Sequence, residues 1–289
     1  MSREKVMTCF PISEALFRRI GDFAYQPKYN GIRCRIVCRP FSKEVELRSS
    51  SDRIITSLPH INDAARAFMA RTSFAGELDS ELWSPDLSFE EIQGSAARNA
   101  PTECSEVSAY IFDILPADSH LNLQRRLSVL SFYDKTLQPP LIRVPTFVRT
   151  DLINDLRSMT KIAKRFQQLG YEGLVMKDLN SFYEPIRSRS WLKLKPDNYD
   201  TYRIIGWKEE VDKNGRPKGT LGALHVIDSA NETFWVGSGL SKQQRQELWE
   251  MKPFNLWVKV RYYGLTGARS VPRHPIFMEI LNDPPMEGE

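Results

Sequence analysis

The sequence predicts an α+β protein made of two domains. Its 289 residues exceed the usual size of one domain, and a hydrophobic content of 41% is ample for a packed core. Up to residue 198, strand-like segments are mixed with an amphipathic helix, whereas the later segments are mostly strand-like. We therefore predict antiparallel sheets with flanking helices over residues 1–198, and a strand-rich domain over residues 199–289.

Three strand-like segments belong to the first domain. Residues 31–39 and 43–48 alternate between apolar and polar side chains, and Pro40 and Ser42 lie between them, which predicts two paired strands. Residues 107–115 form an apolar run that predicts a buried strand.

A helix and a strand follow each other later in this domain. Residues 151–169 carry apolar side chains at helical spacing, with Thr150 available to cap the start and Gly170 to end the helix. A strand over residues 173–177 follows directly. Glu172 is therefore expected where the helix gives way to the strand.

The second domain shows four short strand-like segments and one helix signal. The segments cover residues 201–207, 221–227, 232–237 and 256–263. Ser241 and Gln244 form a capping-box pattern that opens a short helix through Trp249. Several strands with one short helix predict a small barrel of the OB type.

Bulk composition excludes few functions. The net charge of +4 is compatible with a polyanionic partner without requiring one. The four cysteines lack zinc-ligand spacing, which favours buried thiols in a reducing compartment. The first residues lack the apolar stretch of a secretory leader, and no apolar run is long enough to cross a membrane.

Three short segments contain the residues that indicate a chemical function. Residues 28–33 (Lys-Tyr-Asn-Gly-Ile-Arg) place a lysine beside a glycine turn and an arginine, and residues 172–177 place a glutamate and a lysine on a strand. In residues 191–195, Lys193 and Lys195 are two apart and so share one face of a strand. A lysine that attacks a phosphate must be deprotonated, and neighbouring cations lower its pKa. They also neutralise charge on the phosphate during transfer.

These segments resemble the signature of the covalent nucleotidyltransferases, which include DNA ligases, RNA ligases and mRNA capping enzymes. The resemblance is strongest to small ATP-dependent DNA ligases of the viral type, and it covers nearly the whole chain. It implies a nucleotidyltransferase (adenylation) domain followed by an OB-fold β-barrel. It also implies ATP and Mg²⁺ as cofactors and nicked duplex DNA as the partner of a monomer. The expected location is the cytoplasm of a bacterial or virus-infected cell.

The resemblance also assigns roles to residues. Lys28 takes AMP from ATP, AMP passes to the 5′-phosphate at a nick, and the 3′-hydroxyl then displaces AMP. Phe112 stacks on the purine, Lys193 and Lys195 contact the α-phosphate and lower the pKa of the nucleophile, and Arg273 orients pyrophosphate. The full set of residues expected to bind the nucleotide is Arg33, Arg48, Glu77, Phe112, Lys177, Lys193, Lys195 and Arg273. Those expected to hold metal are Glu172 and Glu77, and those expected to contact DNA are Arg33, Arg48, Lys213, Arg216 and Lys218.

Two positions depart from the family pattern. Asn30 and Ala75 stand where relatives usually have aspartate. Glu77 follows Ala75 and Gly76 and matches the acidic position of the pattern. Glu81 is a competing carboxylate four residues further on, and spacing alone does not choose between them.

Several alternative functions remain open, most of which use the same lysine chemistry. An RNA ligase uses the same lysine, although the segment Gly237-Ser238-Gly239-Leu240 resembles DNA ligases more. A capping enzyme would use GTP, and an inactive nucleic-acid-binding protein would account for Asn30 and Ala75. An NAD-dependent ligase is disfavoured because the sequence has no N-terminal extension and no zinc-finger cysteines.

Overall fold

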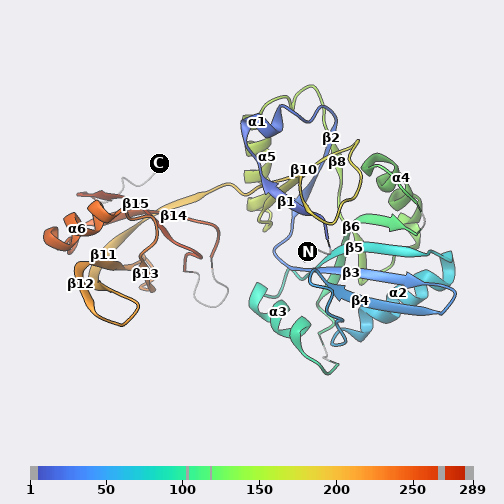
Figure 1. The fold of residues 1–289 in the computed structure, drawn as a ribbon, viewed down its shortest axis with the longest axis horizontal. Coiled ribbons are helices and arrows are strands. Elements are labelled where there is room, and N and C mark those ends of the chain that lie inside the picture. The colour runs from blue at the N-terminus through green and yellow to red at the C-terminus, as the bar shows by residue number, and fades with distance from the viewer. Residues whose placement is uncertain (1–5, 102–103, 118, 266–270, 284–289) are drawn as a thin grey trace. The chain divides into compact units, whose positions relative to one another are not determined.

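The computed structural model describes residues 6–101, 104–117, 119–265 and 271–283. The chain divides into two compact units, Met1–Lys195 and Pro196–Glu289 (Figure 1). The first unit contains two five-stranded sheets, which we call sheet I and sheet II, and the second contains one, sheet III.

Sheet I carries the lysine of the first motif at the end of one strand. In spatial order its strands are β1 (Thr8–Pro11), β10 (Arg187–Leu194), β9 (Gly173–Asp178), β2 (Phe23–Lys28) and β8 (Phe147–Val148). Two helices, α1 (Glu14–Phe17) and α5 (Leu156–Gln168), lie against it (Figure 1). All neighbours in the sheet are antiparallel except β1 and β10.

Sheet II supplies the opposing wall of the first unit. Its strands are β4 (Glu44–Ser49), β3 (Ile32–Arg39), β5 (Gly76–Trp83), β6 (Ser108–Pro116) and β7 (Leu141–Arg143). Three helices and a 3₁₀ turn complete this part: α2 (Pro59–Thr72), α3 (Phe89–Ala97), α4 (Leu123–Tyr133) and η1 (Asp134–Thr136). Apolar residues of α2 and α3 pack on one face of the sheet and form its core. The other face of β3 and β5 is therefore free to carry charged side chains.

Sheet III forms the second unit with one helix. Its strands are β13 (Thr233–Val236), β12 (Pro217–Ile227), β11 (Asn198–Val211), β14 (Trp257–Tyr262) and β15 (Ile276–Leu281), and its helix is α6 (Lys242–Met251). The sheet is open among the described residues, and a single bridge from Ser238 to Ile276 connects its two edges. The expected barrel is thus closed only at this point.

Most predicted elements are confirmed, with shifted ends. The hairpin of β3 and β4, the strands β6 and β9, and helix α6 with its capping box at Ser241 are present. The start predicted for α5 is wrong: Asp155, not Thr150, caps the helix, because its carboxylate accepts the backbone N–H of Ser158 at 2.7 Å. The sequence reasoning placed a strand over residues 191–195, which covers the end of β10, but it missed β5, which supplies site residues, and helices α2 to α4.

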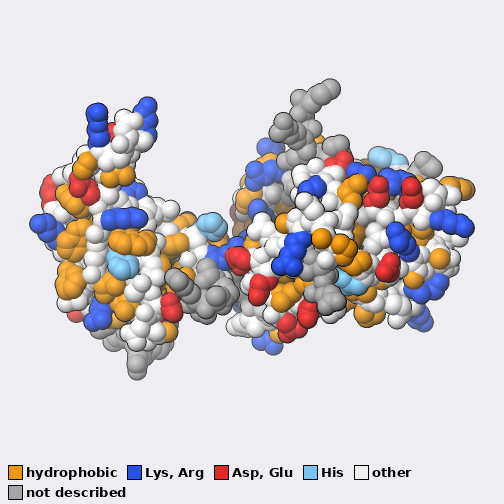
Figure 2. Space-filling view, turned by 90° about the horizontal axis from the view of Figure 1, so that it is seen from below, with side chains coloured by type: hydrophobic (Ala, Val, Ile, Leu, Met, Phe, Trp, Pro, Cys, Tyr) orange, Lys and Arg blue, Asp and Glu red, His pale blue; other side chains and the backbone are white. Residues whose placement is uncertain are grey.

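Charges are distributed evenly over the surface in view. Figure 2 shows acidic and basic side chains interspersed on both units, as expected from the small net charge. The four cysteines are free thiols, and three of them are buried. Within the described ranges, no helix is long and apolar enough to cross a membrane.

Candidate active site at the end of strand β2

Close backbone approach fixes the position of Lys28. Lys28 ends β2, and its carbonyl accepts the backbone N–H of Glu172 at 2.8 Å, which ties β2 to the start of β9. A Cβ at Gly31 would lie 2.1 Å from the carbonyl oxygen of Leu82, so only glycine fits in the turn that follows the lysine. Gly173 is restricted in the same way: its φ is +145°, and a Cβ there would lie 2.2 Å from the carbonyl oxygen of Leu194.

Glu172 joins two lysines from different strands. Its carboxylate forms an ion pair with Lys28 Nζ, and Lys195 Nζ lies 2.9 Å from Oε1 and 2.8 Å from Oε2. All three side chains are largely buried. The loop between α5 and β9 therefore brings Glu172 to Lys28, and the strand end after β10 brings Lys195.

The pKa values of these groups follow from burial and from their partners. Burial opposes the charged form of Lys28, but the carboxylates of Glu172 and Glu81 together outweigh burial and raise the pKa of Lys28. Burial and the positive charge of Lys28 lower the pKa of Lys195. The net shift of Lys28 is therefore upward in this arrangement, because carboxylates lie beside the amine.

A pocket opens beside Lys28, between sheet I and sheet II. It is lined by Cys9, Gln26, Pro27, Lys28, Tyr29, Arg33, Glu81, Phe112, Val175, Lys177 and Trp191. The residues from sheet I alternate along their strands: Val175 and Lys177 of β9 face the pocket, whereas Leu174 and Met176 face α5. Of the sequence-predicted residues, Lys28, Arg33, Phe112 and Lys177 meet here.

Phe112 and Lys177 form an aromatic and cationic wall. The Phe112 ring lies 4.5 Å from Lys177 Nζ and 4.7 Å from the Arg33 guanidinium. Lys177 Nζ also lies 4.1 Å from the Trp191 ring and donates to the Phe112 carbonyl at 3.2 Å. Burial lowers the pKa of Lys177 to about 8. Trp191, which the sequence reasoning did not single out, thus completes the wall.

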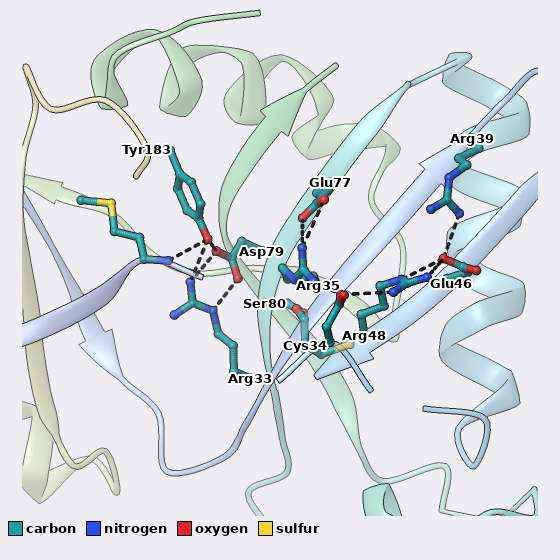
Figure 3. A network of polar contacts seen from close by, with 12 residues as sticks. Arg33, Cys34, Arg35, Arg39, Glu46, Arg48, Glu77, Asp79, Ser80 and Tyr183 are labelled. Carbon is teal, nitrogen blue, oxygen red and sulfur yellow. Dashed lines mark hydrogen bonds and ion pairs between the residues drawn. The ribbon is translucent and has the colours of Figure 1, made fainter. Parts of the chain in front are cut away.

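Arg33 is held by two partners that the sequence reasoning missed. Its guanidinium donates two hydrogen bonds of 2.5 Å to the fully buried Asp79 of β5 (Figure 3). Tyr183, from the loop between β9 and β10, donates to Asp79 at 3.0 Å and also accepts the backbone N–H of Met7 at 3.2 Å. Arg33 is therefore fixed along the pocket wall.

The structure brings Glu81, not Glu77, to Lys28. Glu81 is opposite Arg33 in the β3–β5 register and lines the pocket. Burial raises its pKa to about 7, although the charges of Lys28 and Arg33 act in the opposite direction. Glu77 is opposite Val37 and bonds Arg35 at 3.1 Å, in a separate group of charges (Figure 3). The structure thus does not bring Glu77 to this pocket, where nucleotide and metal contacts were expected of it.

Given the transfer of AMP to Lys28 that the resemblance implies, replacing Glu81 by glutamine is expected to slow labelling of the protein by ATP by about 10²-fold, because the carboxylate beside Lys28 is lost. Glu77→Gln is the matched control and should change the rate less than threefold, since its carboxylate contacts Arg35 outside the pocket. Single-turnover labelling with ATP measures both rates. Equal losses of labelling rate in the two variants would contradict the assignment of Glu81, and not Glu77, to the pocket.

Arg48 also lies outside the pocket. It belongs to β4, the edge strand of sheet II, where its guanidinium bonds Glu46 at 2.8 Å and Asp52 at 3.1 Å (Figure 3). Arg35 bonds Asp52 as well, so the charges form a chain along this face. The structure thus does not bring Arg48 to the nucleotide contacts expected for it.

The remaining candidates are spread over both units. Lys193 is opposite Val175 in the β10–β9 register, next to the pocket lining. Arg273 lies in the second unit, where its backbone N–H donates to the Gly264 carbonyl at 2.8 Å. Lys213 and Arg216 are exposed in the turn between β11 and β12, and Lys218 on β12 bonds Glu210 at 2.5 Å.

The carboxylates near Lys28 suit one kind of metal binding. Among the described residues, no group of three or more His, Cys, Asp or Glu side chains could by itself enclose an ion. Glu81 and Glu172 both act electrostatically on Lys28, at the pocket. Mg²⁺ is commonly held by one or two carboxylates together with substrate phosphates and waters, and these two residues fit that pattern.

Comparisons with known proteins match most of the chain to DNA ligases. Residues 5–195 match the family described as "ATP dependent DNA ligase domain", and residues 214–280 match the one described as "DNA ligase OB-like domain". A protein named probable DNA ligase from Kineococcus radiotolerans is 30% identical over 222 residues, which are 74% of this chain and 41% of that protein. The chain thus spans about two fifths of that relative's length.

Solved structures show the same fold. A structure titled "Pmar-Lig_PreS3" superposes with a TM-score of 0.73 at 23% identity, covering 95% of this chain and 68% of that one. A structure from a study of DNA binding by Lig E DNA ligases gives a TM-score of 0.67 at 21% identity, covering 95% of this chain and 98% of the other.

Proposed function

Because this chain belongs to the ATP-dependent DNA ligase family, we propose that it seals nicks between a 5′-phosphate and a 3′-hydroxyl in duplex DNA. The observation that carries the proposal is the half-buried Lys28, which is ion-paired with Glu172 and lines a pocket that has an aromatic and cationic wall. We assign residues 1–198 to the adenylation domain and residues 199–289 to the OB domain.

In the first step, Lys28 Nζ attacks the α-phosphorus of ATP. A phosphorus–nitrogen bond forms, the bond to the bridging oxygen breaks, and pyrophosphate leaves. Lys28 must first lose its proton, and Glu172 is positioned to accept it because the two groups are ion-paired. Lys195, on the other side of Glu172, keeps positive charge near the α-phosphate.

The next two steps transfer AMP and then release it. A 5′-phosphate oxygen at the nick attacks the adenylate, and Lys28 leaves with its nitrogen reprotonated. The 3′-hydroxyl oxygen then attacks the 5′-phosphorus, loses its proton and displaces AMP. Bound Mg²⁺, held by Glu172 and Glu81 with the phosphates, would neutralise phosphate charge. Arg33 and Phe112 hold the nucleotide, and Arg273 orients pyrophosphate.

Further cations are assigned to DNA. We propose that Arg48 on the exposed side of sheet II and Lys213, Arg216 and Lys218 on the β11–β12 hairpin contact phosphates of the duplex. The protein works as a monomer in a reducing cytoplasm, which the free thiols support.

Incubation with radiolabelled ATP or GTP and Mg²⁺, followed by a chase with nicked DNA or nicked RNA, tests the function. Covalent label from ATP that nicked DNA discharges is the expected result. Label from GTP would indicate a capping enzyme, and discharge by RNA alone would indicate an RNA ligase. No label under any condition would favour the inactive nucleic-acid-binding protein.

Gln26 supports the choice of ATP over GTP. The side-chain amide of this buried residue donates to the Phe112 carbonyl at 3.1 Å and to Thr146 Oγ1 at 2.8 Å. Thr146 Oγ1 itself donates to the Val144 carbonyl at 3.2 Å, so it accepts from Gln26. Both amide hydrogens are then used, and only Oε1 is left to meet a base. Oε1 of Gln26 is a hydrogen-bond acceptor, so it can accept from the amino group of adenine. It would repel the carbonyl oxygen of guanine, which is also an acceptor.

Replacing Gln26 by leucine is expected to reduce the preference for ATP over GTP by about 3- to 10-fold, the effect of one hydrogen bond. Thr146→Val removes one anchor of the amide but leaves Oε1, so its effect should be smaller and in the same direction. The ratio of kcat/KM values for ATP and GTP in protein labelling measures the change. An unchanged ratio in Gln26→Leu would remove this residue from base selection.

A further inference from the structure

Helix α5 has a continuous basic surface. Its residues 156–168 include four Lys or Arg and no Asp or Glu. The four cations are Arg157, Lys161, Lys164 and Arg165, which we call the α5 basic face. All four are exposed, and their spacing places them on one side of the helix over about 12 Å, at about 1.5 Å per residue.

The cations of the α5 basic face have few acidic neighbours. Among the described residues none of the four forms an ion pair, and Arg165 donates to the neutral Gln168 at 3.2 Å. The nearest acid in sequence is Asp155, whose carboxylate caps the helix at the Ser158 N–H and which feels the charges of Arg157 and Lys161 without forming an ion pair with them. A run of unpaired cations on one face is the electrostatic pattern that attracts a polyanion.

The α5 basic face lies on the side of sheet I opposite Lys28. The buried side of α5, formed by Met159, Ala163 and Phe166, packs on Leu174 and Met176 of β9. The alternate residues of β9, Val175 and Lys177, line the nucleotide pocket on the other face. Figure 1 shows α5 beside α1 against this sheet. The thickness of the sheet therefore separates the cations from the reacting phosphates.

The stiffness of duplex DNA determines which DNA segment can reach the α5 basic face. Duplex DNA has a persistence length of about 150 base pairs, so the stretch held at a nick over Lys28 does not curl round a sheet and a helix within one or two turns. DNA on the α5 basic face must then be a separate segment. The apolar residues of α5 that are buried in sheet I are also not available for insertion into a lipid surface.

We propose that the α5 basic face binds the phosphate backbone of a second duplex DNA segment, separate from the segment that carries the nick. The inference rests on the proposed function in taking duplex DNA as the polyanion. Contacts to phosphates alone carry no sequence information, so this binding is independent of sequence and falls with salt. Its effect is to keep the protein on DNA, or to hold two duplexes together, while the pocket works on one of them.

A bridging assay tests the proposal. The full chain is bound to a bead-anchored nicked duplex of about two helical turns (about 20 base pairs), and a fluorescent intact duplex of the same length is added. Wild type is expected to capture the second duplex. The variant with Arg157, Lys161, Lys164 and Arg165 all changed to glutamine should capture at least tenfold less. The slope of log binding against log salt should fall by up to about 3.6, at about 0.9 for each of four contacts.

A matched variant removes the same charge elsewhere in the first unit. Changing the exposed Arg66, Arg71, Arg98 and Lys135 to glutamine should leave capture unchanged. Equal capture by wild type and the α5 variant, or equal loss in both variants, would overturn the proposal. Loss of binding to phosphatidylserine vesicles without loss of DNA capture would overturn it in favour of a membrane.

Labelling by ATP is measured on the same preparations. All three proteins should take label at the same rate, because α5 lies on the other face of sheet I, and this also shows that the variants fold. Absence of label in wild type would reject the proposed ligase activity, whereas capture of the second duplex is scored independently of it.

Discussion

Replacement of Lys28 by alanine is expected to abolish the transfer of AMP from ATP to the protein. The reaction needs an amine at the end of β2, where the pocket meets Glu172, and alanine has no nucleophile. Lys28→Arg should be equally inactive, because the guanidinium keeps the charge but remains protonated. Denaturing gels after incubation with labelled ATP and Mg²⁺ measure the transfer.

The Lys28→Ala variant should still seal a nick that already carries AMP on its 5′-phosphate. In that step the 3′-hydroxyl is the nucleophile and AMP is the leaving group, so no bond to Lys28 forms or breaks. Lys135→Ala removes an exposed lysine and should behave as wild type. Label on Lys28→Ala protein would contradict the assignment and would point to Lys195, whose pKa is lowered and which shares Glu172.

Replacement of Arg126 by methionine is expected to destabilise the first unit by about 3–5 kcal/mol, the cost of breaking a buried ion pair. Arg126 of α4 is almost fully buried and donates to both carboxylate oxygens of Asp113, at 2.9 and 3.0 Å. A third nitrogen donates to the Leu121 carbonyl at 2.7 Å. Without the guanidinium, the Asp113 carboxylate is left buried with an uncompensated charge. Urea unfolding followed by tryptophan fluorescence measures the loss.

A double variant separates the buried charge from lost packing. Adding Asp113→Asn to Arg126→Met removes the uncompensated charge and should recover part of the stability. Arg126→Lys keeps a charge but loses the two-point contact, and it should fall between wild type and Arg126→Met. If Arg126→Met unfolds at the same urea concentration as wild type, the pair does not stabilise the fold. Asp113 follows Phe112 in β6, so this pair also supports the pocket wall.

Local patterns were sufficient to propose Lys28 as the nucleophile and to predict several strands. Lys28 and Gly31 lie in one short segment and Glu172 and Gly173 in another, whereas the backbone carbonyls that leave room only for glycine belong to Leu82 and Leu194. Period-two alternation likewise predicted β3 and β4, because each has one face on a core.

The choice between Glu77 and Glu81 needed the register of the sheet. Residues 77, 79 and 81 alternate onto the same face of β5, since Leu78 and Leu82 face the core. Spacing in the sequence therefore gives no reason to prefer Glu77 or Glu81. The pairing of β5 with β3 decides between them, because it sets Glu81 beside Arg33 and Glu77 beside Val37.

The sequence by itself determined the family and the order of a mixed domain and a strand-rich domain, and it made Lys28 the candidate nucleophile, since these depend on short motifs and on local periodicity. Only the tertiary structure assembled the pocket, in which Cys9, Gln26 and Trp191 join Glu81 from four separate strands or strand ends. It also decided the direction in which the pKa of Lys28 shifts, because Glu172 lies between the two amines. The physical reason is that side-chain electrostatics depend on distances in space, which strand pairing sets and sequence spacing does not.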